Sequence, residues 1–345
     1  MIGYYVHHQG SGHRQRALAV QRAGELELVA LSTAPRPAGW SGDWCLLPDD
    51  DTGPGTDPTA GGRLHYVPQG ATGLLARMAA LSSWFEAARP DALVVDVSVE
   101  VSLLARLHGI PVVVVAQPGR RHDPAHRLAY DIASLIIAPW PASVGGLWGA
   151  TPDDLTKTHF VGAVSRFAPT PPGAERTTRP GAVRRVVVLN GTGGAGAAPH
   201  EVCAARSATP DWEWVHLDAA HGTWVADPRP LLESASVVVS HAVQNAIAEI
   251  AAVGRPALML PQERPFAEQQ VMAAALRRNG YPIEVRHGWP SASEWPRLLS
   301  EVADLDATAW TGWNDGGGAG RMAELLQGMT TSGRLAREGV LACGS

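Results

Sequence analysis

The chain has 345 residues, of which 45% are hydrophobic, and it carries 28 basic and 33 acidic side chains for a formal charge of −5. This length predicts two domains, and the apolar content excludes a disordered chain. The near balance of charge disfavours a general nucleic-acid binder, which is usually strongly basic. The three cysteines are widely separated and form no CxxC pair. We therefore expect neither a zinc site nor a disulfide framework, and a cytoplasmic protein is the default prediction.

The N-terminus shows no basic stretch followed by an apolar one, so we expect no signal peptide. Strands are predicted at residues 2–7, 26–31, 92–97 and 111–115, and helices at 13–23, 73–88 and 98–108. This alternation is typical of a doubly wound α/β domain with a parallel sheet. Residues 49–63 are rich in Gly, Pro and Asp, which predicts an exposed loop. We interpret Asp49–Asp51 in this loop as solvated charge rather than as a metal-binding DxD motif.

The pattern restarts after a segment rich in Pro, Thr and Gly at residues 167–182, which we interpret as a linker. The predicted strands of the second half are 186–190, 214–217, 237–240 and 257–260, with helices at 242–253 and 265–279. We thus predict an N-terminal domain over residues 1–166, a C-terminal domain over 183–330 and a flexible tail over 331–345. The predicted fold class is α/β, with two Rossmann-like domains facing a central cleft, because ligands bind at the carboxyl ends of parallel strands.

A glycine-rich loop follows the first strand of the second domain and matches GxGxxG. It comprises Gly191, Thr192, Gly193, Gly194, Ala195 and Gly196. Glycines in such a loop let backbone N–H groups approach a phosphate. A dinucleotide site would also need an acidic residue after the next strand, and Asp218 is available. Pro199 delays the helix start, however, so a phosphate loop of some other kind is the favoured interpretation.

The segment after the strand 237–240 points to a second phosphate contact. Ser240 or His241 is expected near the start of a helix, where free N–H groups and the helix dipole favour a diphosphate. Glu249 lies two turns later on the same helix face as Ala242 and Asn245, and a carboxylate there suits the two hydroxyls of a ribose. The alternative is a capped helix with an ordinary buried glutamate. Further on, Glu268 and its neighbour Gln269 lie early in the next predicted helix, where they can hydrogen-bond sugar hydroxyls; the alternative is that Glu268 simply favours the first helical turn.

Together, these blocks resemble the donor-binding half of two-domain GT-B nucleotide-sugar glycosyltransferases, most closely the family 28, MurG-like branch. The resemblance rests on His241, Asn245, Glu249, Gly254-Arg255-Pro256, Leu260-Pro261-Gln262 and Glu268-Gln269, and on the N-terminal Gly10-Ser11-Gly12-His13. One position departs from the pattern: relatives often have glycine two residues after the position of His241, and this chain has Val243. That departure bears on how closely a phosphate can approach.

The resemblance implies that Glu249 holds the ribose of a UDP- or TDP-sugar, and that Gly191–Gly194 and the helix start at His241 flank the diphosphate. Glu268 and Gln269 would face the sugar, and the loop at Gly222–Val225 would hold the base. Trp224 in that loop could equally anchor it to the domain. The implied donor-binding residues are Gly191, Thr192, Gly193, Gly194, Trp224, Val225, Ser240, His241, Ala242, Gln244, Asn245, Glu249, Glu268 and Gln269. The implied acceptor-binding residues are Gly10, Ser11, Gly12 and Arg120.

His13 is the candidate general base, since an unperturbed imidazole titrates near pH 6.5 and can accept a proton from an attacking hydroxyl. The alternatives for His13 are a residue near a helix start or an indirect phosphate contact. Asp96 ends a buried strand on the cleft side and could orient His13 or bind the acceptor. Arg120 and Arg121 follow the next strand and could line the acceptor pocket.

The leading functional hypothesis is an inverting, metal-independent glycosyltransferase with no cofactor other than its nucleotide-sugar co-substrate. The alternatives are a nucleotide-sugar 2-epimerase, a non-catalytic nucleotide-sugar-binding protein and, as a fallback, an NAD-dependent enzyme. The acceptor hydroxyl is not identified, and a lipid acceptor would imply peripheral membrane contact. Apolar residues that could form an exposed patch for a lipid, but are better explained as buried, are Ile136, Ile137, Trp140, Leu147 and Trp148.

Overall fold

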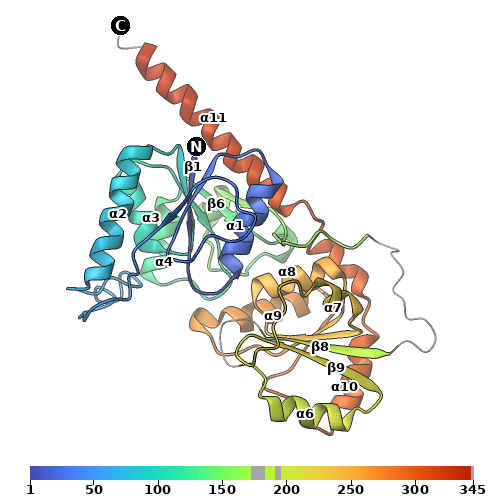
Figure 1. Cartoon of the computed structure of the whole chain (residues 1–345). Coiled ribbons are helices and arrows are strands. Elements are labelled where there is room, and N and C mark those ends of the chain that lie inside the picture. The colour runs from blue at the N-terminus through green and yellow to red at the C-terminus, as the bar shows by residue number, and fades with distance from the viewer. Residues whose placement is uncertain (172–182, 191–195, 343–345) are drawn as a thin grey trace.

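The computed structural model describes residues 1–171, 183–190 and 196–342, with side chains described up to residue 330. The chain forms two α/β units. Each unit has its own parallel sheet, and helices pack around that sheet (Figure 1). In the described part of the chain, no helix combines the length and the apolarity needed to cross a membrane.

The first unit contains a seven-stranded sheet in the order β3-β2-β1-β4-β5-β6-β7, in which every pairing is parallel. Its central strands are continuous apolar runs that are buried on both faces, as parallel sheets require. The strands are β1 Ile2–Val6, β2 Leu28–Ser32, β3 Trp44–Leu46, β4 Ala92–Asp96, β5 Val112–Val115, β6 Leu135–Ala138 and β7 Thr158–Phe160. The helices are α1 Gly12–Ala23, α2 Thr72–Ala88, α3 Val99–Leu107, α4 Pro124–Ile132 and α5 Pro152–Thr156, with a 3-10 turn η1 at Ala142–Val144.

The second unit contains a five-stranded parallel sheet in the order β12-β11-β10-β8-β9. The strands are β8 Arg184–Asn190, β9 Trp212–Asp218, β10 Val237–Ser240, β11 Ala257–Met259 and β12 Ile283–Val285. The helices are α6 Pro199–Ala208, α7 Arg229–Ser234, α8 Gln244–Val253, α9 Glu268–Arg278 and α10 Trp295–Ala303, with 3-10 turns η2 at Pro265–Ala267 and η3 at Ala307–Gly312. The predicted fold class, two Rossmann-like α/β units, is therefore confirmed.

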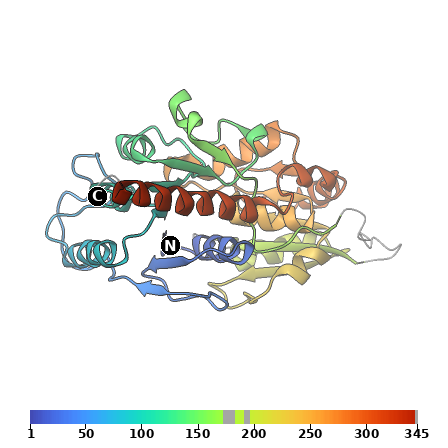
Figure 2. The ribbon, with the colours of Figure 1, turned by 90° about the horizontal axis from the view of Figure 1, so that it is seen from above.

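The last helix, α11 (Gly318–Ala342), returns to the first unit and packs against α1 (Figures 1 and 2). Met322, Ala323 and Leu326 are fully or almost fully buried in the same apolar cluster as Ile2 and Tyr4 of β1. The chain thus crosses between the units a second time, which a division into residues 1–166 and 183–330 does not capture. The backbone is also helical up to Ala342, where the sequence suggests a flexible tail from residue 331.

The start of α8 differs from its prediction. The helix begins at Gln244, two residues later than expected, and its N-cap is Val243 in an extended conformation. The reason is a turn after β10, in which the N–H of Val243 donates to the carbonyl of His241 at 2.8 Å. Ring atom Nδ1 of His241 is in turn 2.8 Å from the carbonyl oxygen of Leu260. The predicted helix start at residue 242 is therefore wrong by two residues, and His241 lies two residues before the N-cap.

Candidate functional site

A cleft of about 510 Å³ lies between the two units, where the carboxyl ends of β1, β4, β5, β8 and β10 face each other. Its position agrees with the rule that ligands bind beyond the carboxyl ends of parallel strands. Predicted site residues that line the cleft are Gly10, Ser11, Gly12, His13, Trp224, Ser240, His241, Gln244, Asn245, Glu249, Glu268 and Gln269. The structure thus brings together the acceptor-side loop and most of the predicted donor-side residues.

On the N-terminal side, an imidazole and a buried carboxylate form a pair. His13 lies in the first turn of α1, and its Nδ1 is 2.9 Å from Oδ1 of Asp96, which ends β4 and is fully buried. The same oxygen accepts a hydrogen bond from Nη1 of Arg16 at 2.7 Å. Asp96 is fully buried and does not line the cleft, so its contact with His13 favours the first of its two predicted roles, orienting the imidazole.

The charge state of Asp96 follows from these partners. Burial raises the pKa of this carboxyl, but the positive charge of Arg16 and the hydrogen bonds from His13 and Arg16 outweigh burial and lower the pKa to about 2. Asp96 is therefore a carboxylate at neutral pH and can only accept hydrogen bonds. Nδ1 of His13 must carry the proton of this hydrogen bond, which leaves Nε2 as the basic nitrogen.

The loop before α1 lets the two units approach closely. A Cβ atom on Gly12 would lie 1.8 Å from Nδ2 of Asn245, at the start of α8, so the absence of a side chain there makes room for this amide. Arg16 links the units directly, since its Nη2 donates to Oε1 of Gln244 at 2.7 Å. The acceptor-side loop and the start of α8 therefore form one continuous wall of the cleft.

On the C-terminal side, Glu249 lies on α8 and is 9% exposed. Its carboxylate pairs with Arg166, whose Nε is 2.8 Å from Oε1 and whose Nη2 is 3.3 Å from Oε2. Burial raises the pKa of Glu249, and the nearby charge of Arg166 offsets this only in part. Each carboxylate oxygen can accept further hydrogen bonds, so the pair with Arg166 leaves capacity for ligand hydroxyls.

Ser240 and His241, at the end of β10, differ in their hydrogen bonds. The hydroxyl of Ser240 donates to the carbonyl of Leu189 at 3.2 Å, which ties β10 to β8. His241 is held through Nδ1, and its buried Nε2 has no hydrogen-bond partner among the described residues. Burial lowers the pKa of His241, and the charge of Arg264 adds to this effect. His241 is thus the polar group in this turn that remains available to a ligand.

Glu268 and Gln269 are the first two residues of α9, which begins three residues later than the predicted helix, and both line the cleft. Glu268 lies 3.4 Å from Nη2 of Arg121, which belongs to the N-terminal unit. Gln269 is almost fully buried, and its side-chain oxygen accepts a hydrogen bond from the N–H of Gln262 at 2.8 Å. The sugar-facing pair of the sequence analysis is therefore held from both units.

Several predicted site residues lie elsewhere. Gly191, Thr192, Gly193 and Gly194 fall outside the described residues. The side chain of Ala242 is buried in the core, and Val225 packs at the edge of that core rather than in the cleft. Arg120 is exposed, and its backbone N–H donates to Phe266. Trp224 both packs against the core and lines the cleft, so its two interpretations are compatible.

Some expectations from outside the cleft are also settled by the contacts. Asp218 is buried, and its carboxylate accepts hydrogen bonds from Nδ2 of Asn190 at 2.9 Å and from the N–H of Ala220 at 2.7 Å. Asp50 pairs with the buried guanidinium of Arg77, which corrects the interpretation of this run as solvated charge only. The five apolar residues considered as a lipid patch are all buried: Ile136, Ile137, Trp140, Leu147 and Trp148.

Three arginines that line the cleft were not identified from the sequence: Arg16, Arg166 and Arg264. Arg16 lies one helical turn after His13 on α1, and this spacing of three residues could have placed both on one face. Arg166 precedes the Pro-rich linker, and no local pattern marks it as part of a site. Only the packing of the connecting segment brings Arg166 to Glu249.

Comparison with known proteins gives a consistent result. Residues 217–287 match the Glycosyltransferase family 28 C-terminal domain. A curated relative from Sorangium cellulosum (strain So ce56) is 29% identical over 234 residues, which is 60% of this chain and 54% of that protein. That relative is a UDP-N-acetylglucosamine–N-acetylmuramyl-(pentapeptide) pyrophosphoryl-undecaprenol N-acetylglucosamine transferase. The chain thus spans about half the length of this relative.

Solved structures show the same fold over nearly the whole chain. The glycotransferase of kitacinnamycin has a TM-score of 0.68 at 18% identity, covering 95% of this chain and 98% of its own. MurG of Acinetobacter baumannii has a TM-score of 0.64 at 15% identity, covering 94% and 98%. CalG4, the calicheamicin glycosyltransferase, has a TM-score of 0.63 at 18% identity, covering 95% and 98%. These structures confirm the predicted GT-B fold, and the family model and the curated relative confirm the resemblance to the family 28, MurG-like branch.

Proposed function

We propose that this chain, a GT-B protein with a segment of the glycosyltransferase family 28 type, transfers a sugar from a UDP- or TDP-sugar to an acceptor hydroxyl with inversion at the anomeric carbon. The observation that carries the proposal is the pairing of His13 with Asp96 at 2.9 Å, in a cleft that Glu249 also lines from the opposite unit. Such a cleft offers a base and a nucleotide-binding carboxylate to two substrates at once. A cytoplasmic location is part of the proposal, because the widely spaced cysteines suit a reducing compartment.

His13 acts as the base in this mechanism. The acceptor oxygen attacks the anomeric carbon, the bond from that carbon to the diphosphate oxygen breaks, and Nε2 of His13 takes the hydroxyl proton. The imidazolium that forms is stabilised by Asp96, which is already ionised and hydrogen-bonded to Nδ1. The arrangement resembles the general case in which a buried carboxylate fixes the tautomer of a catalytic imidazole.

On the donor side, Glu249 accepts hydrogen bonds from the two ribose hydroxyls, and the charge of Arg166 offsets part of the rise that burial causes in the pKa of this carboxyl. The departing diphosphate lies at the N-terminus of α8, where unpaired N–H groups and the helix dipole favour negative charge. Nε2 of His241 faces the same region. It can donate to a phosphate oxygen only after taking a proton, because Nδ1 already binds the carbonyl of Leu260.

The mechanism uses no divalent cation. Among the described residues, the carboxylates that line the cleft are Glu249 and Glu268, and each pairs with an arginine, Arg166 and Arg121 respectively. A carboxylate neutralised in this way is a poor ligand for Mg²⁺, which prefers free carboxylates and water. Positive charge for the leaving group comes instead from α8.

The proposal is tested with a donor panel. Thermal shift with UDP-, TDP- and GDP-sugars identifies the nucleotide, since a ligand stabilises the folded state according to its concentration relative to its Kd. The preferred donor is then incubated with a panel of hydroxyl acceptors, and the anomeric configuration of the product is read by NMR. Release of ManNAc from UDP-GlcNAc without an acceptor would instead identify an epimerase. Donor binding without hydrolysis or transfer to any acceptor would indicate a non-catalytic binding protein.

A further inference from the structure

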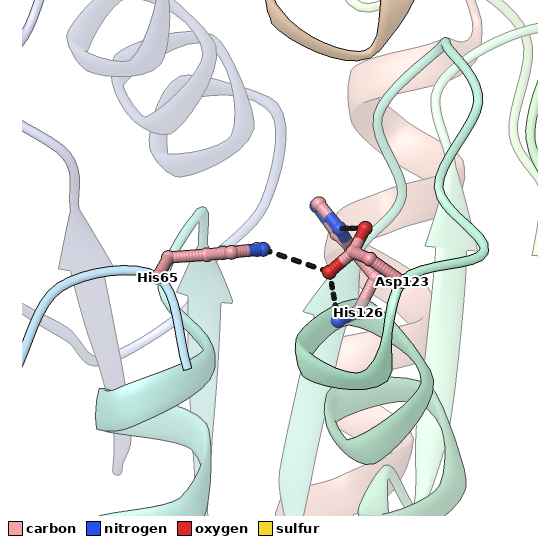
Figure 3. Close-up of side chains that lie close together, drawn as sticks. All are labelled: His65, Asp123 and His126. Atoms are coloured by element: carbon pink, nitrogen blue, oxygen red, sulfur yellow. Dashed lines mark hydrogen bonds and ion pairs between the residues drawn. The ribbon is translucent and has the colours of Figure 1, made fainter. Parts of the chain in front are cut away.

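A second cluster of titratable side chains lies beside the cleft and involves no residue of the proposed catalytic pair. His65 and His126 both point at the carboxylate of Asp123 (Figure 3). Nε2 of His65 is 3.0 Å from Oδ1, and Nδ1 of His126 is 2.6 Å from Oδ2. The three side chains are close enough to hold a metal ion. Two imidazoles and a carboxylate are also a familiar zinc-binding set.

The surroundings of His126 favour a hydrogen-bond chain over a metal site. Its other ring nitrogen, Nε2, lies 2.8 Å from Nη1 of Arg121. A guanidinium can only donate, so Nε2 of His126 must accept, and the ring proton is then on Nδ1 toward Asp123. A metal on Nδ1 would move that proton to Nε2, against the guanidinium, whereas metal-bound histidines donate their second N–H to an acceptor. Burial lowers the pKa of His126 to about 4, which agrees with a neutral ring.

The hydrogen bonds that run from Asp123 to His126 and from His126 to Arg121 hold the guanidinium of Arg121 in place. Nε of Arg121 donates to the carbonyls of Gln117 and Pro118, at 3.1 and 2.9 Å. Nη1 is taken by His126, and the side chain is only 7% exposed. Arg121 lines the cleft, and its Nη2 lies 3.4 Å from Oε2 of Glu268, which lines the cleft as well. This buried cation is therefore oriented by neutral groups of its own unit toward a carboxylate of the other unit.

The backbone before Glu268 is held to the same place. Phe266 and Ala267 both have positive φ, at 61° and 52°, a conformation that costs free energy for residues other than glycine. The carbonyl of Phe266 accepts the N–H of Arg120 at 2.6 Å. Gly119 permits this approach, because a Cβ atom there would lie 2.7 Å from that carbonyl oxygen.

The ring of Phe266 packs against both His126 and Arg121. It packs 4.6 Å from the ring of His126 and 5.0 Å from the guanidinium of Arg121, measured to ring centres. The contact between the units thus places Glu268 against Arg121 and compensates the strain of the turn.

We propose that Arg121 is a specificity-determining residue that binds, together with Glu268, one hydroxyl of the donor sugar. The inference rests on the proposed function. A hydroxyl can accept from Nη2 of Arg121 and donate to Glu268 simultaneously. Nη2 of Arg121 and Oε2 of Glu268 are 3.4 Å apart, so a single oxygen beside the line that joins them can lie at about 2.8 Å from both. The sugar site is then completed only when both units contribute, and the Asp123–His126 pair serves as a positioning element for Arg121.

The test compares UDP-hexoses that differ at one hydroxyl, such as UDP-glucose and UDP-galactose, by calorimetric Kd and by kcat/KM of donor turnover. In Arg121→Gln the preference between the best and the worst sugar should fall about tenfold, the effect of one hydrogen bond to a charged group. The affinity for UDP alone should change less than twofold. The matched control is Arg106→Gln, which removes the same charge from an exposed position in the last turn of α3 and should leave both quantities unchanged.

Two further variants keep the inference testable. If Arg121→Gln does not fold, Arg121→Lys retains the buried charge without the fixed planar donors and should still reduce the preference. The double variant Arg121→Gln/Glu268→Gln should discriminate no worse than Glu268→Gln alone, because both side chains bind the same hydroxyl. Effects that multiply in the double variant would contradict a shared site.

Other outcomes would overturn the inference. An unchanged sugar preference in folded Arg121→Gln would exclude a role for this residue in recognition. Stoichiometric binding of Zn²⁺ alone that is lost in Asp123→Asn would make the cluster a metal site. A wild-type chain that binds no nucleotide sugar would overturn the proposed function and this inference together, whereas lost preference with retained UDP affinity is specific to the sugar site.

Discussion

Two buried carboxylates serve the same cleft from opposite units, and their environments differ. Asp96 receives hydrogen bonds from His13 and Arg16, and its pKa is lowered to about 2. Glu249 has one charged partner, Arg166, and burial raises its pKa despite that partner. Burial acts on both in the same direction. The number and proximity of cationic partners therefore decide whether a buried carboxyl becomes more or less acidic.

The difference suits different tasks. A carboxylate that stays ionised over the whole working pH range gives His13 one fixed tautomer. A buried carboxylate with few hydrogen-bond donors, such as Glu249, is stabilised more by each ligand hydroxyl, because the hydroxyls replace the water that burial has removed. The comparison predicts that the two sites respond differently to mutation and to pH.

The largest effect is expected from His13→Ala. If His13 is the general base and Asp96 fixes its tautomer, this substitution should lower kcat by about 10²–10⁴-fold. The Kd of the donor should hardly change, because the nucleotide contacts lie on the other unit. Steady-state kinetics and calorimetry measure the two quantities, with His159→Ala, an exposed position in β7, as the control. A variant with near-normal kcat would demote His13 to a structural residue.

The next largest effect is expected from Glu249→Gln. Loss of charge-assisted hydrogen bonds to the ribose should weaken donor binding by about 1.5–3 kcal/mol while kcat changes less. The exposed glutamate Glu301 on α10 provides the control Glu301→Gln. Calorimetric titration with the donor and with the free nucleotide gives the affinities. Unchanged affinity in the folded variant would remove the ribose assignment and leave the pair with Arg166 as a purely structural contact.

As the pH falls, the contributions of Asp96 and Glu249 to the free energy of unfolding should change in opposite directions. Asp96 has a lower pKa in the folded state than in the unfolded state, so its contribution is present above about pH 4. It is lost as the pH falls toward 2, by about 2 kcal/mol. Glu249 has a raised pKa in the folded state, so its contribution becomes more favourable as the pH falls through that pKa.

Urea unfolding of the wild type, Asp96→Asn and Glu249→Gln between pH 2 and about 6 measures these contributions. Asp96→Asn should flatten the acid loss of stability, and Glu249→Gln should steepen it. The same slope in all three proteins would show that neither carboxylate titrates as their partners suggest.

The smallest effect is expected from metal removal. Because arginines already neutralise the cleft carboxylates Glu249 and Glu268, EDTA should leave turnover unchanged, and added Mg²⁺ or Mn²⁺ should not raise it. Turnover after chelation, with metal added back, is the measurement. Activity that disappears with EDTA and returns with Mg²⁺ would contradict the metal-independent mechanism and revive Asp49–Asp51 as candidate ligands.

The sequence by itself determined the local elements and much of the cleft. Apolar runs such as 92–95 and 237–239 identify buried parallel strands, because both faces of such strands are covered. Asp96 ends a strand of the first sheet and His241 follows a strand of the second, so each lies at the carboxyl edge of its own sheet. His13 and Glu249 were therefore predictable as residues of the cleft from their positions in the chain.

Only the tertiary structure decided which groups pair across the units. Arg166 meets Glu249 and Arg121 meets Glu268 because connecting segments fold back over the cleft, and no spacing along the chain encodes those distances. The return of α11 to the first unit is likewise a packing result, since its apolar face fits α1 rather than its own neighbours in sequence. Local periodicity specifies which face of an element is apolar, whereas the partner of that face is chosen by the whole fold.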